Sequence, residues 1–216
     1  MTGPEEQEGM TGVTDWETPL RLMPPMAESD TSADWGRMRE SWGKEFPSDY
    51  KQFIEAYGAG SIENYLVVLA PEAKEERLAT EGDGMVHETA NAEAAWARGE
   101  ERSPELAAAT PELIAWGADA SSDILCWDAS GDDPDTWPVL VRNRDDNLWS
   151  RYDCGMVEFL SRMLRADFDE CPLGGLSLWG KQPATFLNER EEKRLLRQGL
   201  DPWTGEPDPY AGMFGD

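Results

Sequence analysis

The chain has 216 residues, with 44 acidic and 19 basic side chains, so its formal net charge at pH 7 is -25. Such a chain is repelled by nucleic acid and by anionic membrane surfaces and attracted to basic protein surfaces, so we expect neither nucleic acid nor a membrane as a direct partner. Ten tryptophans and repeated apolar runs can build a core, which excludes a disordered acidic protein.

The N-terminal segment, residues 1–30, is rich in Pro, Gly and acidic residues and has little periodicity, so we expect a flexible arm. The first predicted helix covers residues 32–43, where apolar side chains recur on one helical face. Ser32 is the candidate N-cap of this helix, and Gly43 is placed to end it.

The stretch FPSDYKQFIEAYGAGSI, residues 46–62, predicts a second amphipathic helix that runs into a Gly-Ala-Gly corner. Pro47 suits the first helical turn, Asp49 complements the helix dipole, and the apolar face begins at Tyr50. Gly58 is placed to take the left-handed conformation that ends the helix. A phosphate-binding loop is the functional alternative, but such loops precede a helix whereas these glycines follow one, so we interpret the corner as structural.

The rest of the chain alternates short apolar runs with polar turns. The run YLVVLAP (65–71) predicts a buried strand, and residues 72–110 look helical and exposed. An antiparallel meander is predicted from four further segments: 113–117, 123–128, 137–142 and 147–152. A helix is expected over 156–164, a strand in 174–180 and a charged helix in 188–199. This order gives an α+β fold, a single antiparallel or mixed sheet with helices on one face.

Three cysteines, Cys126, Cys154 and Cys171, are an odd number without C-x-x-C spacing. They argue against a disulfide framework or a zinc site and fit a reducing compartment. The start, MTGPEEQEGMTG, lacks the features of a secretory signal, and no apolar run approaches the length of a membrane span. We therefore expect a cytoplasmic protein without metal or cofactor.

Two blocks of the sequence carry a family likeness. FPSDYKQFIEAYGAGSI followed by YLVVLAP resembles the N-terminal signature of the SUKH superfamily (Smi/Knr-like domain). The later block, WGADASSDILCWDASGDDPDTWPVLV and LWSRYDCGMVEFLSRML, resembles the second half of that domain, although ADASSD replaces its glycine-bearing turn. The matching motif positions are Pro47, Tyr50, Tyr57, Gly58, Gly60, Trp116 and Gly117. The resemblance implies an α+β domain over residues 31–171, followed by a C-terminal extension, 172–216, of uncertain structure.

In bacteria this resemblance implies an immunity protein that binds and neutralises a cognate polymorphic toxin. In fungi it implies a non-catalytic adaptor or scaffold in envelope or signalling regulation. Many toxins of such systems are nucleases with basic clefts, which would give the acidity a use in partner binding. General acidity that favours solubility is the alternative explanation of the charge.

The sequence contains no recognisable catalytic motif and no paired metal-ligand cluster. His87 is the single histidine and has no nucleophile motif beside it. The acidic turn 130–135 lacks the glycine and terminal glutamate of a calcium loop, and Asp-Pro is ordinary turn chemistry. Cys154 precedes a predicted helix whose start could lower its pKa, yet a packed thiol is the simpler interpretation. We therefore expect no enzyme.

The expected partner-binding surface combines aromatic rings on neighbouring strands with acidic turns. Its candidate residues are Asp123, Trp127, Asp132, Asp133, Asp135, Trp137, Asn143 and Trp149. If helices cover one sheet face only, some of these rings lie on the open face. The alternative is that all of the rings are buried under helices or under the C-terminal extension.

Overall fold

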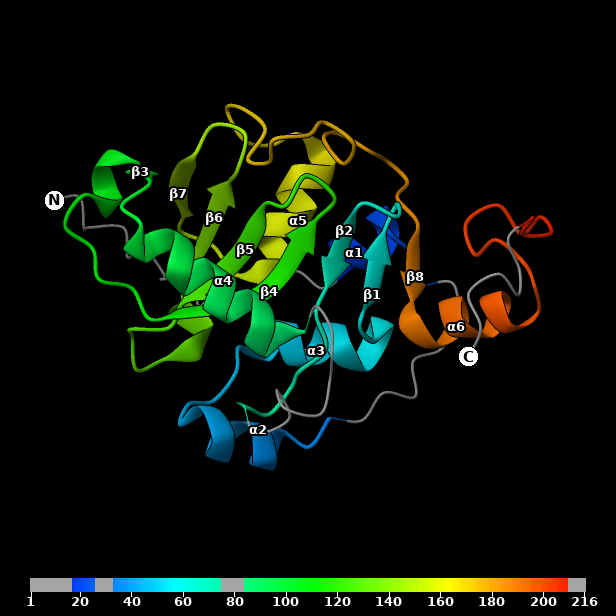
Figure 1. The fold of residues 1–216 in the computed structure, drawn as a ribbon, viewed down its shortest axis with the longest axis horizontal. Helices are drawn as coiled ribbons and strands as arrows, with labels where there is room; N and C mark the ends of the chain where they lie inside the picture. The colour runs from blue at the N-terminus through cyan, green and yellow to red at the C-terminus, as the bar shows by residue number, and fades with distance from the viewer. Residues whose placement is uncertain (1–16, 26–32, 75–83, 210–216) are drawn as a thin grey trace, which may run out of the picture.

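The computed structural model describes residues 17–25, 33–74 and 84–209. Within these ranges eight strands form one sheet, accompanied by six α-helices (Figure 1). The strands are β1 (Gly60–Ile62), β2 (Leu66–Val68), β3 (Glu101–Arg102), β4 (Leu113–Asp119), β5 (Ile124–Asp128), β6 (Val139–Asn143), β7 (Leu148–Tyr152) and β8 (Phe186–Asn188). The helices are α1 (Glu17–Leu22), α2 (Trp35–Trp42), α3 (Ser48–Tyr57), α4 (Met85–Ala97), α5 (Met156–Arg165) and α6 (Glu189–Arg197).

The sheet has the strand order β3-β7-β6-β5-β4-β2-β1-β8. Every neighbouring pair is antiparallel except β3 and β7, which run parallel. The four strands from β4 to β7 follow one another as the expected meander. The prediction of an α+β fold with a single, mostly antiparallel sheet is confirmed.

Helices lie on both faces of this sheet, so the expectation of one covered face was incomplete. In β7, Trp149 packs edge-on against Trp96 of α4, with ring centroids 5.2 Å apart. Tyr152, three residues later and so on the opposite face, packs against Phe159 of α5 at 5.2 Å. Helices α1 and α3 contact α5 and belong to its layer, whereas α4 covers the other face (Figure 1).

The central strands are buried on both sides, which explains why a helix, α4, covers the second face of the sheet. All five residues of β5 are buried, which requires cover on both faces of the sheet. The side of α4 that faces β4 is formed by small or slender residues, including Thr89, Ala92 and Ala95, all buried. Thr89 Oγ1 accepts a hydrogen bond of 2.9 Å from the backbone N–H of Ala115 in β4. From the sequence, residues 72–110 were predicted only as helical and exposed, so the buried side of α4 was missed.

The helix ends follow local chemistry. The candidate N-cap Ser32 lies outside the described residues; Asp34 caps α2, its carboxylate accepting a hydrogen bond from the N–H of Arg37. Gly43 ends α2 in the left-handed conformation, as predicted. Gly58 ends α3 with a φ of 77°, but its ψ of -175° turns the chain directly into β1 instead of completing a left-handed cap.

The Gly-Ala-Gly corner has a structural reason at Gly60. This residue pairs with Asn188 of β8, and a Cβ atom added to it would collide with the carbonyl oxygen of Leu187. Only a residue without a side chain permits this close approach. The corner thus joins α3 to an interior strand of the sheet.

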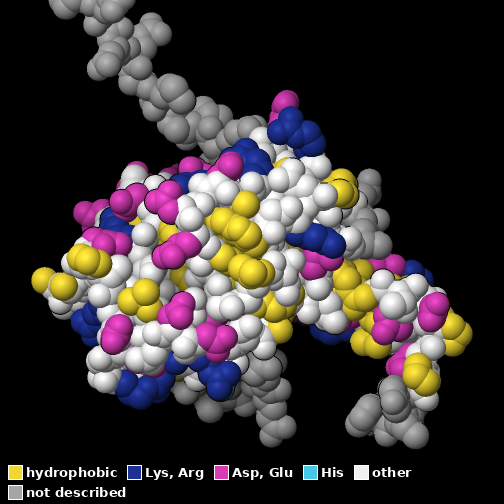
Figure 2. Space-filling model, turned by 90° about the horizontal axis from the view of Figure 1, so that it is seen from above, with side chains coloured by type: hydrophobic (Ala, Val, Ile, Leu, Met, Phe, Trp, Pro, Cys, Tyr) yellow, Lys and Arg dark blue, Asp and Glu magenta, His cyan; other side chains and the backbone are white. Residues whose placement is uncertain are grey.

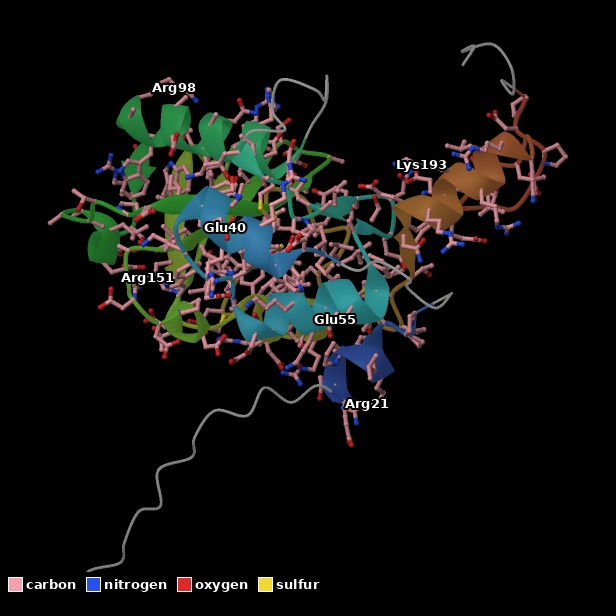
Figure 3. The ribbon with its side chains drawn as sticks, turned by 90° about the horizontal axis from the view of Figure 1, so that it is seen from below. Arg21, Glu40, Glu55, Arg98, Arg151 and Lys193 are labelled. Atoms are coloured by element: carbon pink, nitrogen blue, oxygen red, sulfur yellow. The ribbon has the colours of Figure 1, made fainter. Side chains whose placement is uncertain are left out.

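Segments from both ends of the chain complete the core. Helix α1 falls within the expected arm, yet Leu22 and Met23 are buried, and the Tyr57 hydroxyl donates a 2.7 Å hydrogen bond to the Met23 carbonyl oxygen. In the extension, residues 174–180 form turns, not the expected strand, and the added strand is β8. The expected charged helix is present as α6, which extends away from the body (Figures 1 and 3). None of the described helices is long and apolar enough to span a bilayer.

Candidate functional site

The three predicted surface tryptophans are buried. Trp127 and Trp149 have no exposed area and Trp137 is 3% exposed. Trp127 packs against Tyr50 of α3 at 5.0 Å, whereas Trp149 lies on the α4 side of the sheet. The expected aromatic patch on an open sheet face is therefore not present, because helices cover both faces and take these rings into the core.

Asp123 and Asn143 serve the interior of the fold. Asp123 is fully buried, and its carboxylate accepts hydrogen bonds from the N–H groups of Arg144 (2.7 Å) and Gly174 (2.6 Å). It thereby ties the C-terminal extension to the β4–β5 turn. Asn143 exchanges two hydrogen bonds with Asp146 in the β6–β7 turn. Both side chains act as structural anchors in this conformation.

The predicted acidic turn lies on the surface before β6, at the short 3₁₀ helix η3 (Pro134–Thr136). Asp132, Asp133 and Asp135 are all exposed. Asp133 accepts a hydrogen bond from the N–H of Asp135, and Asp135 accepts one of 2.6 Å from the N–H of Ser48 at the start of α3. No group of three or more potential ligands among the described residues could hold a metal ion.

A cavity of about 600 Å³ opens between η3, the first turn of α3 and one side of α5, and Thr18 of α1 also lines it. Three of the predicted residues line it: Trp127, Asp135 and Trp137. Figure 3 shows the η3 turn beside the beginning of α3, with Arg151 at the same end of the molecule. This cavity, with its lining residues, is the candidate functional site.

Acidic groups dominate the charged lining of the cavity. Four carboxylates line it, those of Asp49, Asp135, Asp153 and Glu158. One guanidinium, that of Arg165, lines it as well. Arg165 forms an ion pair of 2.6 Å with Asp167, and Asp153 pairs with Arg151 at 2.7 Å. Figure 2 shows acidic side chains spread over another face as well, and three of the lining carboxylates, those of Asp135, Asp153 and Glu158, are themselves exposed. The cavity and the buried carboxylate at its wall, not the number of acidic groups, therefore distinguish the site.

Asp49 forms the buried end of the cavity. It is 6% exposed, and its two carboxylate oxygens accept hydrogen bonds from the N–H groups of Tyr50 (2.7 Å) and Val157 (3.0 Å). Burial raises the pKa of this carboxyl, although these hydrogen bonds oppose the effect. Gly155 lines the cavity next to it, and a Cβ atom there would lie 2.7 Å from Asp49 Oδ2.

Two buried polar atoms of the lining residues lack a hydrogen-bond partner among the described residues. They are the hydroxyl oxygen of Ser161, on α5, and the indole nitrogen of Trp127, on β5. Ser161 is 5% exposed. Buried polar atoms are rarely left unpaired, so these two atoms are potential hydrogen-bonding groups of residues in the cavity wall.

Asp49, Asp153, Glu158 and Ser161 were not predicted as site residues. Asp49 was seen only as a complement to the helix dipole, since its contact with Val157 spans 108 positions of sequence. The other three flank or belong to α5, the helix predicted at 156–164. No local signal distinguishes them from the other acidic or hydroxyl residues of this chain.

The residues weighed for catalysis are not grouped at this site. His87 is exposed on α4, on the other face of the sheet. Cys154 lines the cavity, but burial raises its pKa to about 12, contrary to the possible lowering by the helix start. Burial also raises the pKa of the Cys126 thiol.

No family model, no curated protein and no solved structure matches the chain. The resemblance to the SUKH superfamily stays a prediction that rests on the sequence blocks quoted above.

Proposed function

We propose that the protein is a SUKH-type immunity protein, which binds a cognate bacterial toxin one to one and blocks it without catalysis. The observation that carries this proposal is the cavity beside η3, where carboxylates outnumber the single guanidinium of Arg165. A cavity of this charge favours a basic protein surface as its partner. The chain's formal net charge of -25 acts in the same direction.

The burial of the tryptophans narrows the proposed contact surface. Asp123, Asn143 and Trp149 are engaged inside the fold, so the surface consists of the exposed turn from Asp132 to Asp135 and the rim of the cavity. Long-range attraction between this acidic surface and a basic toxin would raise the association rate. A nuclease, whose cleft is basic because it binds phosphates, is the toxin class that fits best.

The proposal is tested by recovering the partner from the native cell. The tagged protein is expected to retain one stoichiometric basic protein through a high-salt wash, and that protein is expected to be encoded by a neighbouring gene. Purified partner should then lose its toxic activity when mixed with the protein at an equimolar ratio. Capture of envelope or signalling proteins would favour the adaptor function instead, and a basic partner whose activity is unaffected would contradict neutralisation.

A further inference from the structure

We propose that the cavity between η3 and α5 receives an arginine side chain from the basic partner protein. This inference rests on the proposed function, since it specifies the chemistry by which the partner is recognised. The volume of about 600 Å³ exceeds that of one side chain, so the cavity also has room for the tip of the loop that presents the arginine.

Charged side chains reach the cavity from three elements of the fold. Asp49 reaches it from α3 and Asp135 from η3, while Asp153 and Glu158 flank the start of α5. Arg165 opposes them as the single cation among the lining residues. Asp153 pairs with Arg151 at 2.7 Å and Glu158 with Arg162 at 3.9 Å, so two of the four carboxylates are partly neutralised. The remaining negative charge would attract a cationic group into the cavity.

The N-termini of α3 and α5 meet at the cavity. An N-terminus attracts anions when its N–H groups are free. In this fold the carboxylate of Asp135 accepts from the N–H of Ser48, and that of Asp49 accepts from the N–H of Val157. Because the protein's own carboxylates occupy these positions, an anionic ligand has little to gain, and a cation is favoured.

The wall of the cavity combines polar and apolar groups. The hydroxyl of Ser161, a lining residue, has no partner in the described part of the chain, and it can accept a hydrogen bond from a ligand N–H once its side chain turns toward the cavity. Trp137 and Pro47 provide apolar wall against which the methylene stem can lie. A guanidinium suits this combination better than an ammonium because it is planar, carries five donors and is weakly hydrated.

In the test of this inference, the full-length protein is titrated with n-propylguanidinium at physiological ionic strength. Binding is measured by calorimetry and by the change in tryptophan fluorescence. One saturable site with a Kd on the order of 1 mM is expected for so small a fragment. The neutral isostere n-propylurea is expected to bind at least tenfold more weakly. Equal binding of the two compounds, or no saturation by either, would overturn the inference.

Matched variants locate the site. Glu158→Gln and Ser161→Ala are each expected to weaken n-propylguanidinium binding about threefold, and Asp153→Asn combined with Glu158→Gln about tenfold. Glu206→Gln removes an exposed carboxylate from the distal C-terminal segment and is the control for diffuse charge effects. Thermal melts confirm that each variant folds. A loss in Glu206→Gln as large as in Glu158→Gln would contradict a defined site.

Further titrations separate this inference from the proposed function. If the captured toxin binds Glu158→Gln and Ser161→Ala as tightly as the unmodified protein, the arginine inference fails while neutralisation stands. If n-propylguanidinium binds as expected but no toxin exists, the proposed function fails and the cation site remains. Spermidine that binds at least a hundredfold more tightly than n-propylguanidinium would assign the cavity to a small polycation instead of a protein.

Discussion

The carboxylate of Asp49, in the first turn of α3, accepts a 3.0 Å hydrogen bond from the backbone N–H of Val157, in the first turn of α5. The N-cap of α5 is Gly155, which has no side chain to satisfy this N–H. Asp135 caps α3 in the same way through the N–H of Ser48. Carboxylates from distant segments thus cap two helices at their positively polarised ends and fix the geometry of the cavity.

Replacing Asp49 by Ala should lower the free energy of unfolding by about 1–2 kcal/mol, the usual effect of losing an N-cap. Gly155→Ser alone should also destabilise, because its Cβ would lie 2.7 Å from Asp49 Oδ2. In the Asp49→Ala background the same serine has space and can cap α5 itself. Gly155→Ser is therefore expected to be stabilising there, as measured by urea denaturation.

The control for this cycle is Gly36→Ser within α2, where a Cβ meets only Asp34 Oδ1 at 3.4 Å. Its effect should be the same with and without the Asp49→Ala substitution, because the two sites are separate. Additive effects of Gly155→Ser and Asp49→Ala would contradict the capping relationship.

The free energy of unfolding should fall as the pH rises from about 4 to about 6, because of the ionisation of Asp119. Burial, with the nearby charge of Asp123, raises the pKa of Asp119 to about 6 from 3.8. In this interval the folded state retains a proton that the unfolded state has released, so rising pH favours unfolding. Asp119→Asn keeps an acceptor oxygen for the N–H groups of Ser121 and Asp123 but cannot ionise.

The expected result is that Asp119→Asn is more stable than the unmodified protein at pH 7 by about 2 kcal/mol. The difference should vanish below about pH 4, where the Asp119 carboxyl is protonated in both the folded and the unfolded state. Urea titrations at several pH values measure this difference. A constant difference at every pH would assign the effect to packing and not to the charge of Asp119.

Phe186 should be essential to the fold although it lies in the extension. Its ring packs edge-on against Phe53 at 5.5 Å and Tyr57 at 5.3 Å, and it is 1% exposed. Phe186→Ala is expected to cost about 3–5 kcal/mol of unfolding free energy. Leu196→Ala, on the exposed side of α6, is the matched control and should change stability by less than about 0.5 kcal/mol. If Phe186→Ala and Leu196→Ala changed the free energy of unfolding equally, the packing of β8 would not contribute to the stability of the fold.

If the proposed immunity function is right, charge reversal at Asp132 should slow association with the basic partner protein. Asp132 is exposed and makes no hydrogen bond or ion pair with the described residues, so Asp132→Lys tests charge without disturbing the fold. Stopped-flow kinetics should show about threefold slower association at low salt and a weaker dependence on salt. Glu206→Lys, on the distal C-terminal segment, is the control. Unchanged kinetics in Asp132→Lys would remove the turn from the interface.

The sequence by itself determined the local elements. The apolar spacing that starts at Tyr50 identified α3, and the β-branched and aromatic runs identified the meander from β4 to β7. Gly43 was correctly placed at a helix end. These features depend on period and on turn chemistry within a few residues, which the sequence carries directly.

Only the tertiary structure decided which faces are covered and which side chains meet. Trp149 was one of the candidate rings for an open sheet face, but packing of α4 on the second face of the sheet buries it. Asp49 caps α5 by accepting a hydrogen bond from the N–H of Val157, which is 108 positions away in the sequence. Such contacts depend on how helices stack on the sheet, and the burial energy that selects one arrangement is summed over the whole core. A local sequence pattern does not contain this total burial energy. The cavity therefore could not be predicted before the packing of the helices on the sheet was known.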